Sequence, residues 1–164
     1  MIAGSGQQAG VGETGTELAY VVGFIFDSDR HRVALIRKNR PPWQAGLLNG
    51  VGGKIESGES AAQAMARETR EEAGYYIAPW QWKHFAELSG SNDGPGESFR
   101  LQVFAATEDL SRLETTEGEA IEIVHISKIN WMRHEMVANL PWLIGLALDH
   151  LEDGRPAFAI VTYL

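Results

Sequence analysis

The stretch from Gly53 to Tyr75, GKIESGESAAQAMARETREEAGY, contains the strongest structural signals of the chain. Ser60 followed three positions later by Gln63 is a capping-box pattern, and Gly74 is typical of the left-handed residue that follows a helix. Between these signals the sequence is rich in Ala, Met, Arg and Glu, which favour helix formation. The stretch therefore predicts a helix over Ala61–Ala73.

One face of this predicted helix is acidic. At 100° per residue, Glu68, Glu71 and Glu72 fall within one turn of each other. The opposite face, which is suited to packing, consists of Ala62, Met65, Ala66, Thr69 and Ala73. Like charges at this spacing destabilise an isolated helix, and a divalent cation would offset the repulsion. Mg²⁺ prefers oxygen ligands, so the acidic face predicts a Mg²⁺ site in which Mn²⁺ can substitute.

Composition narrows the class of protein. The 164 residues suffice for one domain, and we expect a flexible leader over residues 1–17 followed by a single domain over 18–164. The net charge of −8 argues against a nucleic-acid polymer as partner, but not against a small anionic ligand at a bound metal. The lack of cysteine excludes disulfides and thiolate catalysis. No apolar run is long enough to span a membrane, so we expect a cytoplasmic protein without membrane contact, either a monomer or a homodimer.

The remaining sequence alternates short apolar runs with turns, a pattern typical of a mixed α/β domain. Strands are predicted over residues 18–26, 31–37, 80–88, 98–106, 120–126 and 155–164. Loops are predicted over 38–50 and 89–96, and a second, mostly apolar helix over 137–151. The near-continuous apolar runs at 20–26 and 158–164 indicate a sheet that is buried on both faces, with one helix on each.

Seven residues of the opening stretch resemble the Nudix box of the Nudix hydrolases: Gly53, Glu59, Arg67, Glu68, Glu71, Glu72 and Gly74. The chain departs from the family pattern at Thr69 and Tyr75, where aliphatic residues are preferred, and both positions face packing rather than chemistry. The resemblance implies an α/β/α sandwich with a mixed β-sheet between helices. It also implies a Mg²⁺-dependent pyrophosphohydrolase that cleaves a phosphoanhydride bond.

The resemblance implies roles for individual residues. Glu68, Glu71, Glu72 and the carbonyl of Gly52 would bind metal, with Glu59 reaching in from the preceding loop. Glu68 is also the candidate base that takes a proton from water.

Two basic residues have both a functional and an ordinary interpretation. Arg67 would pair with a box carboxylate, the alternative being an exposed arginine. Lys54 would contact substrate phosphate, the alternative being a solvated loop lysine.

Some Nudix enzymes add an acid from outside the box. Glu122, on the predicted strand 120–126, is the candidate for that catalytic role. Glu117 and Glu119 are rivals in the adjacent loop, and Glu122 could equally form the polar face of an alternating strand.

The segment before the box bears on the substrate. Asn49 to Lys54, NGVGGK, is similar to the corresponding segment of Nudix enzymes that hydrolyse oxidised purine nucleoside triphosphates, where the asparagine contacts the base. The segment from Asn139 to Leu143 is similar to their second base-contacting region. Leu48, Ala138 and Asn139 depart from that subgroup, and Asn49 could also be an ordinary turn residue before glycine.

These observations favour hydrolysis of a nucleoside triphosphate, such as the oxidised purine dNTP 8-oxo-dGTP, to a monophosphate and pyrophosphate. One alternative is a hydrolase of ADP-ribose or another nucleoside-diphosphate-linked substrate. A second alternative, from a different class, is a Nudix-fold module that binds a nucleotide without turnover. Loss of box carboxylates would favour this module, and none is lost.

Overall fold

The computed structural model describes residues 17–91, 98–116, 118–152 and 158–163. The predicted leader 1–17 lies outside these residues except for Glu17, which is the first residue of a strand. Residues 92–96 of the predicted loop 89–96 and residues 155–157 and 164 of the last predicted strand also lie outside them.

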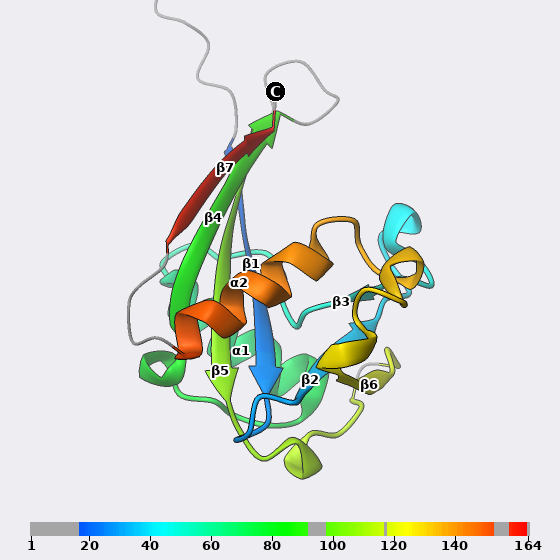
Figure 1. The fold of residues 1–164 in the computed structure, drawn as a ribbon. Coiled ribbons are helices and arrows are strands. Elements are labelled where there is room, and N and C mark those ends of the chain that lie inside the picture. The colour runs from blue at the N-terminus through cyan, green and yellow to red at the C-terminus, as the bar shows by residue number, and fades with distance from the viewer. Residues whose placement is uncertain (1–16, 92–97, 117, 153–157, 164) are drawn as a thin grey trace, which may run out of the picture.

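A seven-stranded mixed sheet forms the centre of the described domain (Figure 1). Its strands are β1 (Glu17–Phe26), β2 (Arg32–Arg37), β3 (Leu48–Asn49), β4 (Lys83–Ser91), β5 (Ser98–Thr107), β6 (Ile121–His125) and β7 (Ala159–Tyr163). The order is β3-β2-β1-β5-β4-β7, with β6 also paired to β2. β1 pairs in parallel with β5 and β4 with β7, whereas the other pairs are antiparallel.

Two α-helices cover the sheet, α1 (Ala61–Ala73) and α2 (Leu140–Glu152), and Figure 1 shows α2 across the near face with α1 behind. Alternate residues of β1 and β2 point to the two faces. Thus Ile25 and Ile36 pack with Met65 of α1, whereas Phe24 and Leu35 pack with Leu140, Leu143 and Ile144 of α2. The predicted α/β/α sandwich is confirmed. Short 3₁₀ helices lie at Pro42–Gln44, Pro79–Gln81, Leu110–Arg112, Ile126–Lys128 and Arg133–Glu135.

The sequence signals at the ends of α1 are confirmed in detail. The side chain of Ser60 accepts a hydrogen bond from the backbone N–H of Gln63, and the side chain of Gln63 accepts one from the backbone of Ser60. Gly74 has φ of 63°, which glycine adopts at little cost. Both ends of α1 are therefore fixed by local chemistry, and this fixes the position of its acidic face.

Several element boundaries differ from the sequence prediction. The strand predicted from Trp80 begins at Lys83, because Pro79 starts a 3₁₀ turn. It then continues to Ser91, so Ser89 to Ser91 are strand rather than loop. The second helix begins at Leu140 instead of Val137, because the N–H of Val137 donates to the carbonyl of Leu48 in β3.

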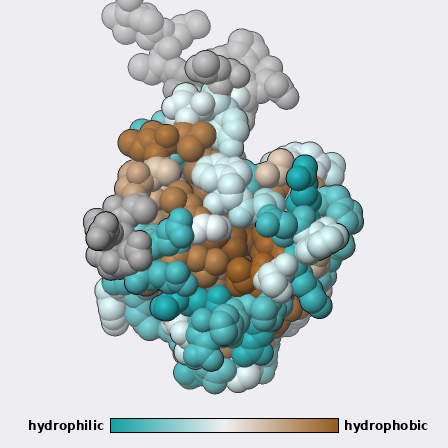
Figure 2. Space-filling view, in the orientation of Figure 1, coloured by the Kyte–Doolittle hydropathy of each residue, from teal (hydrophilic) through white to brown (hydrophobic). Residues whose placement is uncertain are grey.

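The last strand was predicted to be buried on both faces, and this was wrong. β7 is an edge strand, and its Ile160 is 71% exposed. Figure 2 shows hydrophobic surface over this strand, where Phe158 and Tyr163 are also exposed. Within the described part of the chain, no helix is both long and apolar enough for a membrane span.

We predict that Ala66→Asp will destabilise the domain by about 3 kcal/mol or more, because Ala66 is buried at 3% exposure and a carboxylate there would lack a partner. Gln63→Glu is the matched control, since it adds a carboxylate to the exposed first turn and preserves the capping box. Denaturant unfolding of both variants measures the difference. Equal stability of the two variants would contradict the packing of α1 described above.

Candidate active site

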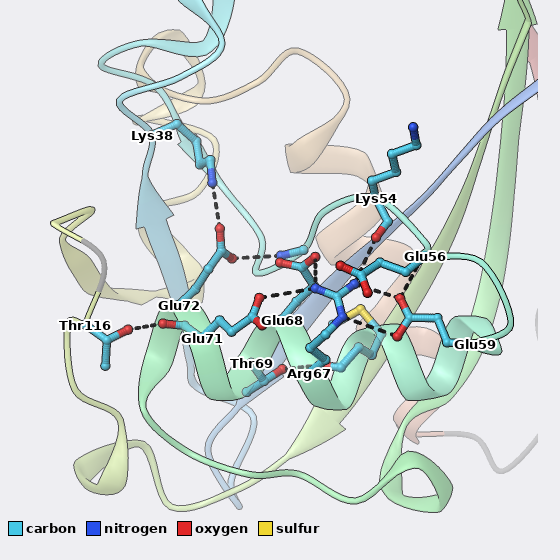
Figure 3. A network of polar contacts seen from close by, with 12 residues as sticks. Lys38, Lys54, Glu56, Glu59, Arg67, Glu68, Thr69, Glu71, Glu72 and Thr116 are labelled. Carbon is cyan, nitrogen blue, oxygen red and sulfur yellow. Dashed lines mark hydrogen bonds and ion pairs between the residues drawn. The ribbon is translucent and has the colours of Figure 1, made fainter.

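Arg67, in the middle of α1, is the centre of a network of carboxylates (Figure 3). Its Nε and Nη2 donate to the two oxygens of Glu59, at 3.2 and 2.7 Å. Its Nη1 donates to Glu68 at 2.7 Å and to Glu71 at 3.2 Å. Nη2 also donates to the carbonyl of Lys54 at 2.9 Å, which ties the helix to the loop before it. The planar guanidinium thus fixes three carboxylates at once.

The contacts in this network bear on the predicted roles of Arg67 and Glu59. Arg67 pairs with box carboxylates, and is not an isolated surface arginine. Glu59 accepts from Arg67 with both oxygens, and its hydrogen bonds with Arg67 lower the pKa of its carboxyl. Glu59 therefore orients Arg67 in this structure, and its role beside a bound metal stays a prediction.

Glu68 lies against the glycine loop that precedes the helix. A Cβ at Gly53 would collide with the carboxylate of Glu68, so only glycine allows this close approach. Burial raises the pKa of Glu68, and the charge and hydrogen bond of Arg67 oppose this shift only in part. A nearly buried carboxyl with a raised pKa is suited to accept a proton.

Glu72 is the most buried acid of the helix, at 7% exposure. Its Oε2 accepts from the backbone N–H of Gly52 at 2.9 Å, and its Oε1 accepts from Nζ of Lys38 at 2.8 Å. A Cβ at Gly52 would collide with the backbone of Val21 in β1, so this loop also requires glycine. Gly52 contacts Glu72 through its N–H, and the metal-binding role of its carbonyl remains a prediction.

Lys38 and Glu119 are brought to the same place by strand pairing. The antiparallel register of β2 and β6 pairs Ile36 with Ile121, and continuing it by two residues sets Lys38 opposite Glu119. Nζ of Lys38 is 2.5 Å from Oε2 of Glu119 and 2.8 Å from Oε1 of Glu72. Burial alone would lower the pKa of Lys38, but the charge of Glu72 and the hydrogen bonds to both carboxylates raise it, which keeps the ammonium form.

The same register places Glu122 on the other face of the sheet. Glu122 is paired with Leu35, whose side chain belongs to the core under α2, so Glu122 shares that face. Its oxygens accept from Arg37 at 2.6 and 2.8 Å. Of the acids proposed from outside the helix, the structure therefore brings Glu119 to Glu72, and Glu122 forms an ion pair with Arg37, which also pairs with Glu135; Glu117 lies outside the described residues.

Glu71 is the most exposed of the three helix acids. Its side chain is 47% exposed and accepts from Arg67, and its backbone carbonyl accepts from the hydroxyl of Thr116 (Figure 3). The N–H of Glu114 donates to the carbonyl of Ala73, so the segment that leads to Glu119 is attached to the end of the helix.

The predicted substrate-binding residues are Lys54, Asn49 and Asn139. Lys54 is exposed, and Figure 3 shows its ammonium pointing away from the carboxylates. Asn49 donates to Gln44 at 3.0 Å and accepts from the N–H of Gly50 at 2.8 Å. Asn139 follows Val137, which is hydrogen-bonded to Leu48. The two asparagines therefore belong to neighbouring backbone segments.

The residue types of this cluster suit a divalent cation, because its ligands would be carboxylate oxygens, which magnesium and manganese prefer. Among the residues that the structure describes, no three acidic or histidine side chains are already gathered as a set of metal ligands. The ammonium of Lys38 already occupies a position between Glu72 and Glu119, which shows that a cation is accommodated there. Lys38 was not singled out in the sequence, because only the pairing of β2 with β6 reveals its neighbour.

Comparison with known proteins gives the class to which this fold and site belong. The NUDIX domain model matches residues 17–150, and the chain therefore belongs to the NUDIX domain family. Enzymes of this family are hydrolases of phosphoanhydride bonds and generally use divalent metal cations.

Individual relatives agree with this assignment. The chain is 29% identical over 161 residues to the uncharacterized Nudix hydrolase YvcI of Bacillus subtilis (strain 168), covering 90% of this chain and 94% of that protein. Its fold is similar to that of the mutator MutT protein of Bacillus halodurans, with a TM-score of 0.64, 20% identity and coverage of 89% and 90%. It is also similar to the NUDIX domain of Shewanella oneidensis NrtR in complex with ADP ribose, with a TM-score of 0.67, 17% identity and coverage of 83% and 89%.

We predict that Arg67→Lys will weaken metal binding by about 10- to 100-fold, since an ammonium cannot hold Glu59, Glu68 and Glu71 together. Isothermal titration with Mn²⁺ measures the affinity. Arg100→Lys is the control, because Arg100 forms exposed pairs with Glu17 and Glu87 outside the site. Unchanged affinity in Arg67→Lys would contradict the organising role of this arginine.

A second pair of variants tests whether Glu119 or Glu122 contributes to metal binding. Glu119→Gln should weaken Mn²⁺ binding by about tenfold or more, because an oxygen beside Glu72 loses its charge. Glu122→Gln should leave the affinity within about twofold, because its carboxylate pairs with Arg37 on the opposite face of the sheet from Glu72. A larger loss in Glu122→Gln than in Glu119→Gln would restore the sequence-based choice of Glu122.

Proposed function

We propose that this chain is a Mg²⁺-dependent pyrophosphohydrolase that converts a nucleoside triphosphate to a nucleoside monophosphate and pyrophosphate. The observation that supports this proposal best is the convergence of Glu72 and Glu119 on one cationic atom, Nζ of Lys38, beside the Arg67 network. Isolated buried carboxylates are costly, and such a cluster is typical of a site that binds cations.

The proposed metal ligands are Glu68, Glu71 and Glu72 of α1 and the carbonyl of Gly52, with Glu119 in place of Glu122 as the acid from outside the helix. A bound Mg²⁺ ion would neutralise phosphate charge and polarise the attacking water. Mn²⁺ is expected to substitute, since it accepts the same oxygen ligands.

Glu68 is the proposed base. Arg67 donates to its Oε1, so Oε2 is the oxygen available to take the proton from the attacking water. Gly53 leaves space directly beside this carboxylate, and burial favours its protonated form after the transfer. Arg67 and Glu59 maintain the orientation of Glu68.

Neighbouring groups would bind the nucleotide. Lys54 is exposed at the start of the box and can rotate toward a phosphate. Asn49 and Asn139 lie on adjacent segments and offer the amide groups that recognise a purine edge. Trp43 is 67% exposed and lies in the 3₁₀ helix Pro42–Gln44, whose Gln44 accepts a hydrogen bond from Asn49. Its ring supplies a surface on which a base can stack. We therefore favour an oxidised purine dNTP such as 8-oxo-dGTP.

ADP-ribose, or another nucleoside-diphosphate-linked compound, is the second candidate substrate, because the similar NUDIX domain of NrtR was solved with ADP ribose. A binding module without turnover is less favoured, since all four box glutamates are present. Arg67 pairs with three of them, and Glu72 pairs with Lys38. We expect the protein to act in the cytoplasm on free nucleotides, as a monomer or a homodimer, without a membrane or nucleic-acid partner.

Incubation of the pure protein with Mg²⁺ and a nucleotide panel, with products identified by mass, distinguishes these functions. Pyrophosphate and a monophosphate from a dNTP are expected. AMP and ribose phosphate from ADP-ribose would instead support the second candidate. No cleavage of any anhydride, with nucleotide binding retained, would indicate the module without turnover.

Glu72→Gln should lower kcat by about a hundredfold or more while the domain remains folded, because the volume is conserved and one ligand charge is lost. Circular dichroism checks the fold, and Glu87→Gln on β4 is the control outside the site. Parental activity in Glu72→Gln would remove Glu72 from the proposed mechanism.

A further inference from the structure

Lys38 is an unusual feature of this site, because a nearly buried ammonium contacts two nearly buried carboxylates. The side chains of Lys38, Glu72 and Glu119 are 12%, 8% and 10% exposed. One positive charge therefore faces two negative charges in a space with little water. Close charge pairs are strong when they are shielded from solvent, so this contact matters more than a surface ion pair.

Each carboxylate is positioned by a backbone group on its other oxygen. Oε2 of Glu72 accepts from the N–H of Gly52 at 2.9 Å, and Oε1 of Glu119 accepts from the N–H of Asn39 at 2.6 Å. These bonds come from backbone that the sheet and the glycine loop fix in place. The remaining oxygens, Oε1 of Glu72 and Oε2 of Glu119, both face Lys38. The space between them is thus a cation position defined by backbone, and Lys38 fills it.

We propose that Lys38 is a positioning residue that acts as the internal cation of the metal-free site and is displaced from Glu72 and Glu119 when a divalent cation binds. This inference rests on the proposed function. Without Lys38 the two carboxylates would repel each other across a short distance. With Lys38 they keep their charge and orientation, and the site is ready for exchange of one cation for another.

Displacement follows from the geometry of the contacts. Magnesium contacts oxygen at about 2.0–2.1 Å, so an ion bound to these two oxygens would lie close to the Lys38 ammonium, which is 2.5 and 2.8 Å from them. Repulsion between the two cations in this nearly buried space favours displacement of the ammonium. Lysine has a flexible four-carbon stem, and rotation of that stem moves the ammonium without moving the strand. Lys38 directly follows the last residue of β2, so its backbone can remain in place.

The competing interpretation is a permanent ion pair. In that case Lys38 would remain on Glu72 and Glu119 throughout, and metal would bind only at Glu68 and Glu71. The two interpretations differ in what happens to the Lys38 ammonium on metal addition, which can be measured on the unaltered protein.

The chemical reactivity of lysine amines provides this test. The sequence contains only four lysines, Lys38, Lys54, Lys83 and Lys128, so acetylation by an N-hydroxysuccinimide ester can be followed at each by mass spectrometry. Lys38 should react slowly without metal and several-fold faster at saturating Mg²⁺. The exposed Lys83 and Lys128, outside the cluster, should be unchanged and serve as internal controls.

Calorimetric titration of the same sample with Mg²⁺ distinguishes a failure of Lys38 displacement from a failure of the proposed function. Mg²⁺ binding with an unchanged rate at Lys38 would overturn the displacement of Lys38 and leave the proposed function intact. Absence of Mg²⁺ binding would overturn both. Mg²⁺ binding with faster reaction at Lys38 supports both.

A variant gives an independent measurement. Lys38→Met preserves much of the aliphatic stem and removes the competing ammonium, so Mn²⁺ affinity without nucleotide should rise by about tenfold. Lys83→Met removes the same charge from an exposed position of β4 outside the site, and its affinity should change by no more than about twofold. Equal or weaker Mn²⁺ binding in Lys38→Met, with the fold retained by circular dichroism, would contradict the proposal.

Discussion

Repulsion among carboxylates is the interaction on which the rest of this site depends. Glu68 and Glu72 of α1 and Glu119 before β6 place negative charge in a space with limited solvent. Two basic side chains neutralise it from two sides: Arg67 contacts Glu59, Glu68 and Glu71, and Lys38 contacts Glu72 and Glu119. The outcome is an excess of acid around a defined position, which is the electrostatic condition for binding a divalent cation.

The scaffold positions the site through the backbone of the glycine loop and of the sheet more than through side chains. Gly52 and Gly53 allow the loop before α1 to lie directly on β1 and on the Glu68 carboxylate, where a Cβ would collide. Antiparallel pairing of β2 with β6 brings Glu119 to Lys38 from a distant part of the sequence. Because these constraints come from the sheet, the carboxylates are held in position before any ligand arrives.

Local signals in the sequence were sufficient for α1. The capping box at Ser60 and the glycine at position 74 gave both ends of the helix correctly, since these interactions involve residues only a few positions apart. The apolar pattern indicated only a mixed α/β domain, and the sandwich was implied by the resemblance to the family. Features set by tertiary contacts were missed. Val137 is hydrogen-bonded to β3, so α2 begins later than predicted, and β7 lies at the edge of the sheet, which its apolar composition did not indicate.

The choice between Glu119 and Glu122 could not be made from the sequence. Both follow the same loop, and the alternation of a strand decides which one faces α1 only when its register with β2 is known. For the same reason Lys38 gave no signal, because its partners lie 34 and 81 positions further along the chain. Residues whose role depends on long-range pairing are therefore those that pattern analysis alone does not identify.

Anomalous X-ray scattering from crystals soaked in Mn²⁺ tests the central claim most directly, because it locates the ion without assumptions about activity. The account predicts a peak within bonding distance of oxygens from both Glu72 and Glu119, with the Lys38 ammonium moved away from them. A peak elsewhere, or none at saturating Mn²⁺ with the Lys38 contacts unchanged, would contradict it.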